Sequence, residues 1–542
     1  MGRNPKSEIP NPKSIKKLLI ANRGEIAVRV IRAARDMGIR TVAVYSDADA
    51  HQMHVALADE AVALGPPEPA ASYLDLAKII EAARKTGADA VHPGYGFLSE
   101  RAEFSQACAD AGIIFVGPPA SAMRLLGSKI EAKRLAVGLG VPVTPGFFEP
   151  GASRAELKKA AQEIGYPVML KASAGGGGRG MRIVREPEAF DEEFSIASDE
   201  ALKAFGDGSM MVEKLIDRPR HIEVQVLADS HGNVACLFER ECSIQRRHQK
   251  LIEEAPSPSS FFSRGGTLGT SLAPSLKSVE DPGPVGKEGG RGVEIWSRMQ
   301  TAARNLIKAA GYTNAGTVEF MFDQATGSFY FLEVNARLQV EHPVTEMITG
   351  VDLVEWQIRI ASGETLTIPE ALLAGDRRAI QGHAIEARVV AEDPGANFLP
   401  SVGRILAWAE PKHPGVRVDT GYGPGAEISR HYDSLSAKVI AHGENRDQAL
   451  IRLEAALLDF HILGIKTNVS YLLDVIRHPE FRAGEFDTGF LDREFAGWHP
   501  STAIPDELLD IAGAATAAMG GPDDAPEQPK VWDMADSFRI AR

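Results

Sequence analysis

The sequence has few cysteines, no long apolar run and no block of positive charge. Its 542 residues include only Cys108, Cys236 and Cys242, whose spacing matches neither a metal site nor a disulfide framework. This scarcity indicates a reducing compartment. No apolar run could cross a bilayer, and the N-terminus lacks the hydrophobic core of a signal peptide. These absences predict a cytoplasmic protein without a membrane anchor; an organellar leader would have to be unusually short.

Charge and nucleotide motifs exclude further classes. The formal net charge of −14, with no basic block, argues against nucleic acid as a partner. Residues 21–25 follow the first predicted strand but lack the glycine pattern of a dinucleotide site. The glycine-rich residues 174–180 are not closed by Lys-Ser or Lys-Thr, so they are not a Walker loop. The length of 542 residues, of which 44% are hydrophobic and 24% charged, predicts a globular protein of roughly two to four domains.

Strands and helices alternate in the N-terminal part. Residues 15–20 and 41–45 are typical of strands, and residues 25–37 are typical of a helix that ends before Gly38. This β–α–β order predicts a parallel sheet and an α/β fold class. The same alternation predicts a helix over residues 73–86 and strands over residues 90–92 and 113–116.

A strand, a glycine-rich loop and a second strand follow at residues 167–171, 174–180 and 181–184. Glycine lets backbone N–H groups approach phosphate oxygens without a Cβ clash. With Lys171 before the loop and Arg179 within it, the segment predicts a flap over a nucleotide. A plain flexible turn is the alternative.

Two strands at residues 317–322 and 329–335 predict a hairpin with a three-residue loop, residues 325–327, that places Gly327 in the left-handed region. This hairpin would set Glu319 opposite Glu333, with Asn335 on the same face. Converging carboxylates repel each other unless a cation lies between them, and all-oxygen ligands favour Mg²⁺. A solvent-facing polar side of the hairpin is the alternative.

A cationic cluster stands out in this acidic chain: Arg246, Arg247, His248 and Lys250 lie within five residues, interleaved with glutamines. It favours polyphosphate or bicarbonate as a ligand over a solvated basic turn.

Residues 333–346 closely resemble the signature of biotin carboxylases, which are ATP-grasp enzymes, and the resemblance extends from about residue 15 to about residue 490. It departs at Ala336, where the family has Thr or Pro, and at Ala174, where it has Gly. The implied fold is an ATP-grasp fold with a parallel-sheet pre-ATP-grasp domain at its N-terminus. The implied division is residues 15–128, an ATP-grasp domain 129–355 with a mobile lid at about 143–215, a C-terminal biotin carboxylase domain 356–490 and a tail 491–542. Residues 259–292, rich in Ser, Gly and Pro, are a predicted flexible insertion before a helix at 294–310.

The resemblance also implies the site. The metal, Mg²⁺ or Mn²⁺, is expected at Glu319, Glu333 and Asn335, and the catalytic set is Lys250, Arg337, Glu341 as general base, and Arg388. For Arg388 the alternative is a surface pair with Glu386. The residues implied to bind ATP or bicarbonate are Lys129, Lys171, Gly175, Gly176, Gly177, Gly178, Glu213, Lys214, Leu215, Ile216, His221, Gln245, His248, Gln339 and Val340.

The implied activity is ATP-dependent carboxylation of biotin by bicarbonate. The chain has no Ala-Met-Lys-Met run and no room for a carboxyltransferase, so biotin is expected on a separate carrier protein. The expected partners are that biotin carboxyl carrier protein, a carboxyltransferase subunit and a second copy of the chain. Another ATP-grasp ligase, or a nucleotide-binding scaffold without activity, are the alternatives. The final acceptor, whether acetyl-CoA, propionyl-CoA, pyruvate or another, is not indicated.

Overall fold

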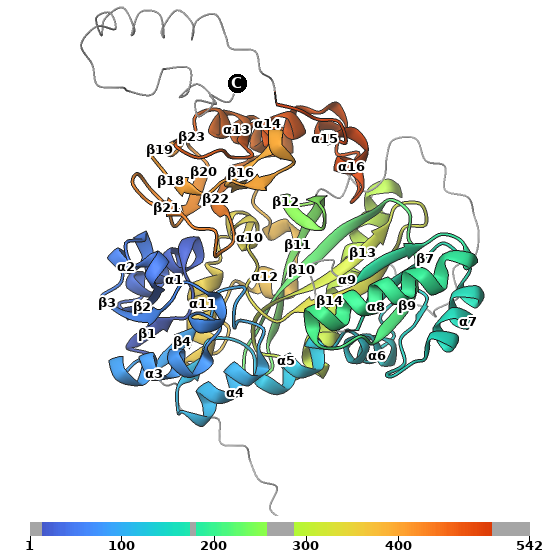
Figure 1. Cartoon of the computed structure of the whole chain (residues 1–542), viewed down its shortest axis with the longest axis horizontal. Coiled ribbons are helices and arrows are strands. Elements are labelled where there is room, and N and C mark those ends of the chain that lie inside the picture. The colour runs from blue at the N-terminus through green and yellow to red at the C-terminus, as the bar shows by residue number, and fades with distance from the viewer. Residues whose placement is uncertain (1–13, 174–179, 257–286, 501–542) are drawn as a thin grey trace, which may run out of the picture.

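The computed structural model describes residues 14–173, 180–256 and 287–500. Gly175, Gly176, Gly177 and Gly178, most of the predicted insertion and the tail after residue 500 lie outside the described residues. Figure 1 shows the N-terminal part, a small sheet with its helices, and the C-terminal part arranged around a central sheet. No described helix is long and apolar enough to cross a membrane.

The N-terminal part is a five-stranded parallel sheet in the order β3-β2-β1-β4-β5. It confirms the predicted β–α–β order, because β1 and β2 pair in parallel on either side of α1. Its elements are β1 (Lys17–Ile20), α1 (Gly24–Asp36), β2 (Arg40–Ser46), α2 (Met53–Leu57), β3 (Glu60–Gly65), α3 (Leu76–Thr86), β4 (Ala90–His92), α4 (Ala102–Asp110) and β5 (Ile114–Phe115).

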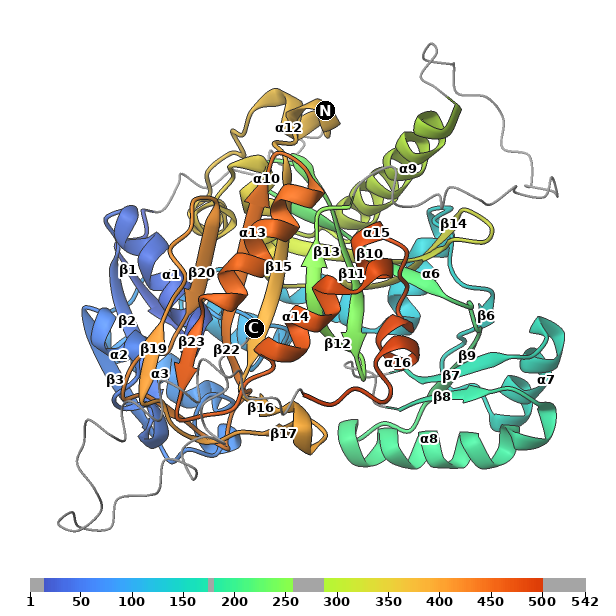
Figure 2. The same cartoon turned by 90° about the horizontal axis from the view of Figure 1, so that it is seen from above.

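The small sheet is antiparallel, in the order β6-β9-β7-β8, and its side chains pack against α7 and α8 around Leu157, Val168 and Phe190. It lies to one side of the central sheet (Figure 2). The predicted glycine-rich loop connects β7 to β8, as a strand–loop–strand flap requires. The elements are α5 (Ala120–Gly127), α6 (Lys129–Gly138), β6 (Gly146–Phe147), α7 (Arg154–Ile164), β7 (Val168–Ala172), β8 (Met181–Val184), α8 (Phe190–Phe205) and β9 (Met210–Lys214).

The central sheet has eight strands in the order β14-β13-β10-β11-β12-β15-β22-β20. It runs across the boundary expected near residue 355, because β12 pairs with β15. Its strands are β10 (Pro219–Ala228), β11 (Val234–Arg246), β12 (Gln249–Glu254), β13 (Asn314–Asp323), β14 (Ser328–Asn335), β15 (His383–Val390), β20 (Val416–Thr420) and β22 (Leu435–Gly443).

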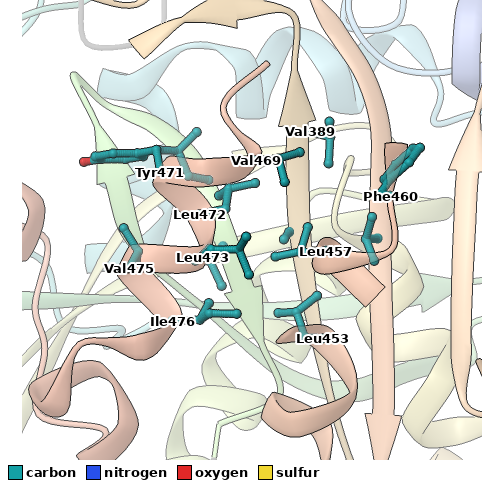
Figure 3. Close-up of a cluster of buried hydrophobic side chains, with 14 of the residues drawn as sticks. Val389, Leu453, Leu457, Phe460, Val469, Tyr471, Leu472, Leu473, Val475 and Ile476 are labelled. Carbon is teal, nitrogen blue, oxygen red and sulfur yellow. The ribbon is translucent and has the colours of Figure 1, made fainter. Parts of the chain in front are cut away.

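Helices α13 (Arg446–Leu458) and α14 (Val469–Arg477) cover one face of the C-terminal half of this sheet (Figure 3). Val389 of β15 packs there with Leu457 and Leu472 in a buried apolar cluster. Side chains alternate along a strand, so Glu386 and Arg388 of β15 point to the opposite face. That polar face carries the candidate site.

The remaining helices and strands are short. The helices include α10 (His342–Thr349), α11 (Leu353–Ala361), α12 (Glu370–Ala374), α15 (Pro479–Ala483) and α16 (Phe490–Glu494). The strands include β16 (Glu392–Asp393), β17 (Leu399–Pro400), β18 (Gly403–Arg404), β19 (Ala407–Ala409), β21 (Glu427–Ile428) and β23 (His461–Leu463).

Two sequence boundaries were wrong. Helix α9 spans Lys287–Ala309 and so begins seven residues before the predicted start at 294, inside the predicted insertion. Its buried Trp296, Met299 and Leu306 pack against the central sheet, and this packing supports a helix whose first turn is too rich in glycine to be predicted. The loop between β13 and β14 has four residues, 324–327, instead of three.

Candidate functional site

The β13–β14 hairpin places the predicted metal residues. Glu319 is the register partner of Glu333, as predicted, and Gly327 has φ +70°. The register depends on a bulge, because pairing shifts by one residue between Phe320–Phe331 and Glu319–Glu333. Without the bulge, Glu319 would face Leu332. Thr317 pairs with Asn335, two residues along, which sets Asn335 on the same face as Glu333.

Carboxylate and amide oxygens of this face suit a hard divalent cation. Asn335 donates to Glu319 Oε1 at 2.8 Å, and Lys129 Nζ lies 3.7 Å from Glu333. His221 Nε2 lies 3.2 Å from Glu319 Oε2. Burial raises the pKa of Glu319, but Lys250 and His221 outweigh it and hold this pKa well below its usual range. A carboxylate that is always ionised, beside a second carboxylate, is a suitable ligand pair for Mg²⁺.

Lys250 is the cation at the centre of the site. Its ammonium lies 2.6 Å from Glu223, 3.0 Å from Glu319 and 2.7 Å from Glu341. Burial would lower the pKa of Lys250, but the surrounding groups raise it well above its usual value, so it stays charged. Three carboxylates from β10, β13 and the start of α10 therefore meet one ammonium.

Glu341, the predicted base, is fully buried immediately before α10. It accepts from Lys250 at 2.7 Å and from Arg388 at 2.9 Å. Burial raises its pKa, but Lys250, Arg388 and Arg240 together lower it well below the usual value. Arg388 also lies 2.5 Å from Glu253. The alternative of a surface pair between Arg388 and Glu386 is wrong, because Glu386 is fully buried.

The segment after β14 is fixed by hydrogen bonds. Arg337 donates to Gln339 at 2.7 Å and to Asn335 at 3.2 Å, and it lies 3.2 Å from Glu100 of the N-terminal part. Lys438 of β22 donates to the Val340 carbonyl at 2.9 Å. Arg337 and Gln339 thus lie beside Asn335 and Glu319, and Val340 is held by Lys438.

The nucleotide residues predicted on β7 and β9 also meet. Glu213 accepts from Lys171 at 2.7 Å and from Lys133 of α6. Burial raises the pKa of Glu213, but Lys171 and Lys133 lower it to about 2. The backbone N–H groups of Lys214 and Leu215 donate to the carbonyls of residues 145 and 167. Ile216 follows directly after β9 and is partly exposed.

The cationic cluster forms the β11–β12 turn and the strand ends beside it. Arg246 makes two 2.7 Å bonds to Glu392, and Gln245 is the register partner of Lys250. Arg247 and His248 are the exposed two-residue loop, with φ of +50° and +65°. Both angles are in the left-handed region, which is the geometry of a type I′ turn and is unfavourable for residues with a Cβ. The alternative of a solvated basic turn therefore describes Arg247 and His248 but not Arg246 or Lys250.

Several residues of the site were not assigned from sequence. Glu223 lies two residues after His221 on β10 and is fully buried. Arg240 donates to Glu223 at 2.6 Å and holds it behind Lys250. The sequence signal for Glu223 is the row of polar residues at every second position of a strand that is buried on both faces. The other unassigned residues with contacts to the site are Glu100, Lys133, Glu253 and Lys438.

Family models match most of the chain. The biotin carboxylase N-terminal domain matches residues 14–123, the ATP-binding domain of the carbamoyl-phosphate synthase L chain matches 128–262 and 293–369, and the biotin carboxylase C-terminal domain matches 386–493. The break between 262 and 293 coincides with the predicted insertion.

Curated relatives include mouse methylcrotonoyl-CoA carboxylase subunit alpha, 47% identical over 489 residues, covering 90% of this chain and 63% of the relative. Mouse pyruvate carboxylase is 47% identical over 505 residues, covering 92% of this chain and 40% of the relative. The chain therefore spans less than two thirds of either relative. Both are mitochondrial proteins.

A solved structure covers the chain almost end to end. The biotin carboxylase domain dimer of Hydrogenobacter thermophilus 2-oxoglutarate carboxylase, in complex with MgADP, ADP and bicarbonate, is 43% identical. It covers 88% of this chain and 97% of its own, with a TM-score of 0.77. With three family models and a structural match over 88% of its length, the chain belongs to the biotin carboxylase family of ATP-grasp enzymes.

Proposed function

We propose that this chain carboxylates biotin held on a separate carrier protein, using bicarbonate and ATP. The observation that carries the proposal is the meeting of Glu341 with Lys250 and Arg388, at 2.7 and 2.9 Å, beside the Glu319–Glu333 face. A buried base between two cations suits an anionic substrate that must lose a proton. Glu319, Glu333 and Asn335 would hold the divalent cation, which would neutralise charge on the transferred phosphoryl group.

In this mechanism Lys250 and Arg337 bind bicarbonate, and Glu341 takes its proton. The bicarbonate oxygen then attacks the γ-phosphorus of ATP, the bond to ADP breaks, and carboxyphosphate forms. Its C–O bond cleaves to give CO₂ and phosphate; phosphate takes the ureido N–H proton of biotin, and that nitrogen attacks CO₂. Arg337 and Arg388 stabilise the negative ureido oxygen.

The same residues explain why Glu341 is ionised before substrate arrives. Its low pKa makes it a weak base while Lys250 and Arg388 both contact it. An arriving anion competes for these two cations. As they turn toward bicarbonate, the pKa of Glu341 rises toward its usual value, and the carboxylate becomes basic where the proton must be taken.

The assembly is part of the proposal. We place biotin on a carrier protein and the second half-reaction on a carboxyltransferase subunit, since the curated relatives are carboxylases longer than this chain. The dimer of the Hydrogenobacter domain supports a homodimer. We also propose the domain division at 15–128, 129–355 and 356–490. Family-model ends at residues 123 and 128 support its first boundary, whereas the models leave the second boundary between residues 369 and 386. Three buried, unpaired thiols fit a reducing compartment; we propose the cytoplasm, and cell fractionation tests this against the mitochondrial location of the mouse relatives.

The test is release of ADP by the purified chain with ATP, Mg²⁺ and bicarbonate, with and without free biotin. Biotin is expected to increase the rate only when bicarbonate is present. Bicarbonate-dependent release that biotin leaves unchanged would favour another ATP-grasp ligase, and no release under any condition would favour a scaffold. Affinity purification of the partner carboxyltransferase identifies the acceptor.

A further inference from the structure

Two buried carboxyl groups behind the candidate site lack the hydrogen bonds that ionised groups require. Glu253 of β12 and Glu386 of β15 are both fully buried. Among the described residues, neither oxygen of Glu386 has a hydrogen-bond partner, and Oε2 of Glu253 has none either. An ionised carboxylate without water or donors costs several kcal/mol in a protein interior.

The two groups are neighbours across the sheet. Glu253 and Glu386 are register partners in the antiparallel β12–β15 pair. Side chains of such partners point to the same face, with Cβ atoms about 4.5–5.5 Å apart. Their carboxyl groups are therefore close enough to meet. One proton on the pair would supply a donor and satisfy an oxygen on each side.

The surroundings decide which group carries that proton. Arg388 donates through Nε to Glu253 Oε1 at 2.6 Å, so Glu253 is stabilised as the anion. No donor reaches Glu386 from the described residues. Arg388 also bonds Glu341 at 2.9 Å, which makes it a bridge between the pair and the candidate base.

We propose that Glu386 is a neutral carboxylic acid that donates its proton to the free oxygen of Glu253, and that this acid–carboxylate pair positions Arg388 toward the reacting groups. Glu386 and Glu253 are positioning residues, because they act through Arg388. The protonation of the pair stands on its own geometry, whereas its effect on turnover rests on the proposed function.

The electrostatics agree with this assignment. Burial raises the pKa of Glu386 well above its usual value; Lys438 and Arg388 oppose this, and Glu253 and Glu341 add to it. Burial likewise raises the pKa of Glu253 to about 7, although the positive charge of Arg388 lowers it. The two carboxyl groups interact and titrate as a pair, which holds one proton at neutral pH and loses it as pH rises.

The neighbouring groups do not change charge in that range. The charged groups that act on the pair are Lys250 of β12, Glu341 before α10, Arg388 of β15 and Lys438 of β22. The Cys242 thiol of β11 also interacts with Glu253, and His342 follows Glu341 and interacts with Lys438. Burial raises the pKa of the Cys242 thiol and lowers that of His342, so both are neutral near pH 7. The pKa values of Lys250 and Lys438 are raised, since carboxylates around each outweigh burial, and both stay charged. Beyond Lys438 lie Glu25 and Asp419, 2.8 and 3.6 Å from its ammonium.

The proposal predicts opposite behaviour of two uncharged replacements. Glu386→Gln keeps an N–H donor for Glu253, whereas Glu386→Leu removes it. Gln is expected to keep biotin-dependent turnover within about threefold at neutral pH, and Leu to lower it by about tenfold or more. Loss of the shared proton is expected to lower wild-type turnover at alkaline pH. Because Gln cannot lose a proton, this decline should move to higher pH in Glu386→Gln. Equal turnover of the two variants, or an unchanged alkaline decline, overturns the positioning role.

The protonation state of the pair can be measured without an activity assay. Infrared difference spectra of the full chain labelled with ¹³C-glutamate, wild type minus Glu386→Gln at neutral pH, are expected to contain the C=O stretch of a carboxylic acid. That band should disappear as pH rises. Its absence at neutral pH overturns the proposal, even if Glu386→Leu fails to fold. The spectra need no turnover, so failure of the proposed function is distinguished from failure of this inference.

Discussion

At the residue scale, the site is a network in which few cations hold many carboxylates. Lys250 contacts three carboxylates, and Arg388 contacts two. Lys250 stabilises the ionised forms of Glu319 and Glu341, and Arg388 adds to this effect at Glu341. Replacement of a single carboxylate should therefore leave the fold intact while changing what the remaining cations bind.

Glu341→Gln removes the proposed base but keeps a side chain of the same shape. Turnover dependent on biotin and bicarbonate should fall by roughly 10²–10⁴-fold, because the loss is in proton removal from bicarbonate. The affinity for ATP, measured by calorimetry, should change little. Glu454→Gln, at a partly buried carboxylate on α13 that pairs with Arg477 and Arg482, is the control. A variant at Glu341 with normal turnover would leave this residue a structural partner of Lys250.

Glu333→Gln tests the cation site. With one of two facing carboxylates gone, the Mg²⁺ concentration for half-maximal turnover should rise at least about tenfold. The melting temperature without Mg²⁺ should stay constant or rise, since repulsion from Glu319 is relieved. Glu131→Gln on the exposed side of α6 is the control for loss of one surface carboxylate. An unchanged Mg²⁺ requirement would contradict the ligand role.

At the element scale, the β11–β12 turn is a strained turn beside the site, since Arg247 and His248 both have positive φ. Replacing the pair by Asn-Gly, the favoured sequence for this turn, should raise the free energy of unfolding by about 1 kcal/mol. Because His248 is a proposed nucleotide contact, the affinity for ATP should fall in the same variant. Urea unfolding and ATP titration measure the two effects. A variant that is less stable than the wild type would show that the hydrogen bond from Arg247 to Asn397 outweighs the strain.

The elements also show how far sequence reasoning reaches. The Glu319–Glu333 pairing was predictable from two alternating strands and a turn glycine. It forms, however, through a β-bulge that the sequence pattern does not indicate. The buried pair of Glu253 and Glu386 was not predictable, since these two residues lie more than 130 positions apart in the sequence and the register of β12 and β15 is a tertiary property. Local sequence patterns predict strands and hairpins, whereas the pairing of strands distant in sequence depends on tertiary packing.

At the scale of the whole molecule, one sheet joins regions that the sequence separates. The base at Glu341, its partner Arg388 and the proposed cation residues lie on a surface formed by β10 to β15. Lys438 links this surface to Glu25 of α1 at 2.8 Å. The N-terminal part therefore contacts this surface. It lies on one side of the central sheet, and the small sheet that carries Lys171 lies on the other (Figure 2).

The last prediction concerns the segment between β12 and α9. The described contacts of Lys250 and Glu253 are made by residues outside this segment. Their strand β12 pairs with β11 on one side and with β15 on the other. Helix α9 is anchored by Trp296 and Leu306 in the core. Replacing residues 259–286 by a short Gly-Ser link, and keeping α9 from Lys287, should preserve biotin-dependent turnover within about twofold. Loop length has only a weak effect on stability, about 0.6 kcal/mol per doubling, so the melting temperature should change little.

A second variant, in which residues 259–286 are exchanged for Gly-Ser without shortening, separates the effect of length from that of sequence. If both variants stay folded and dimeric but lose turnover, residues 259–286 take part in the reaction; if only the shortened one loses it, the link is too short to span β12 and α9.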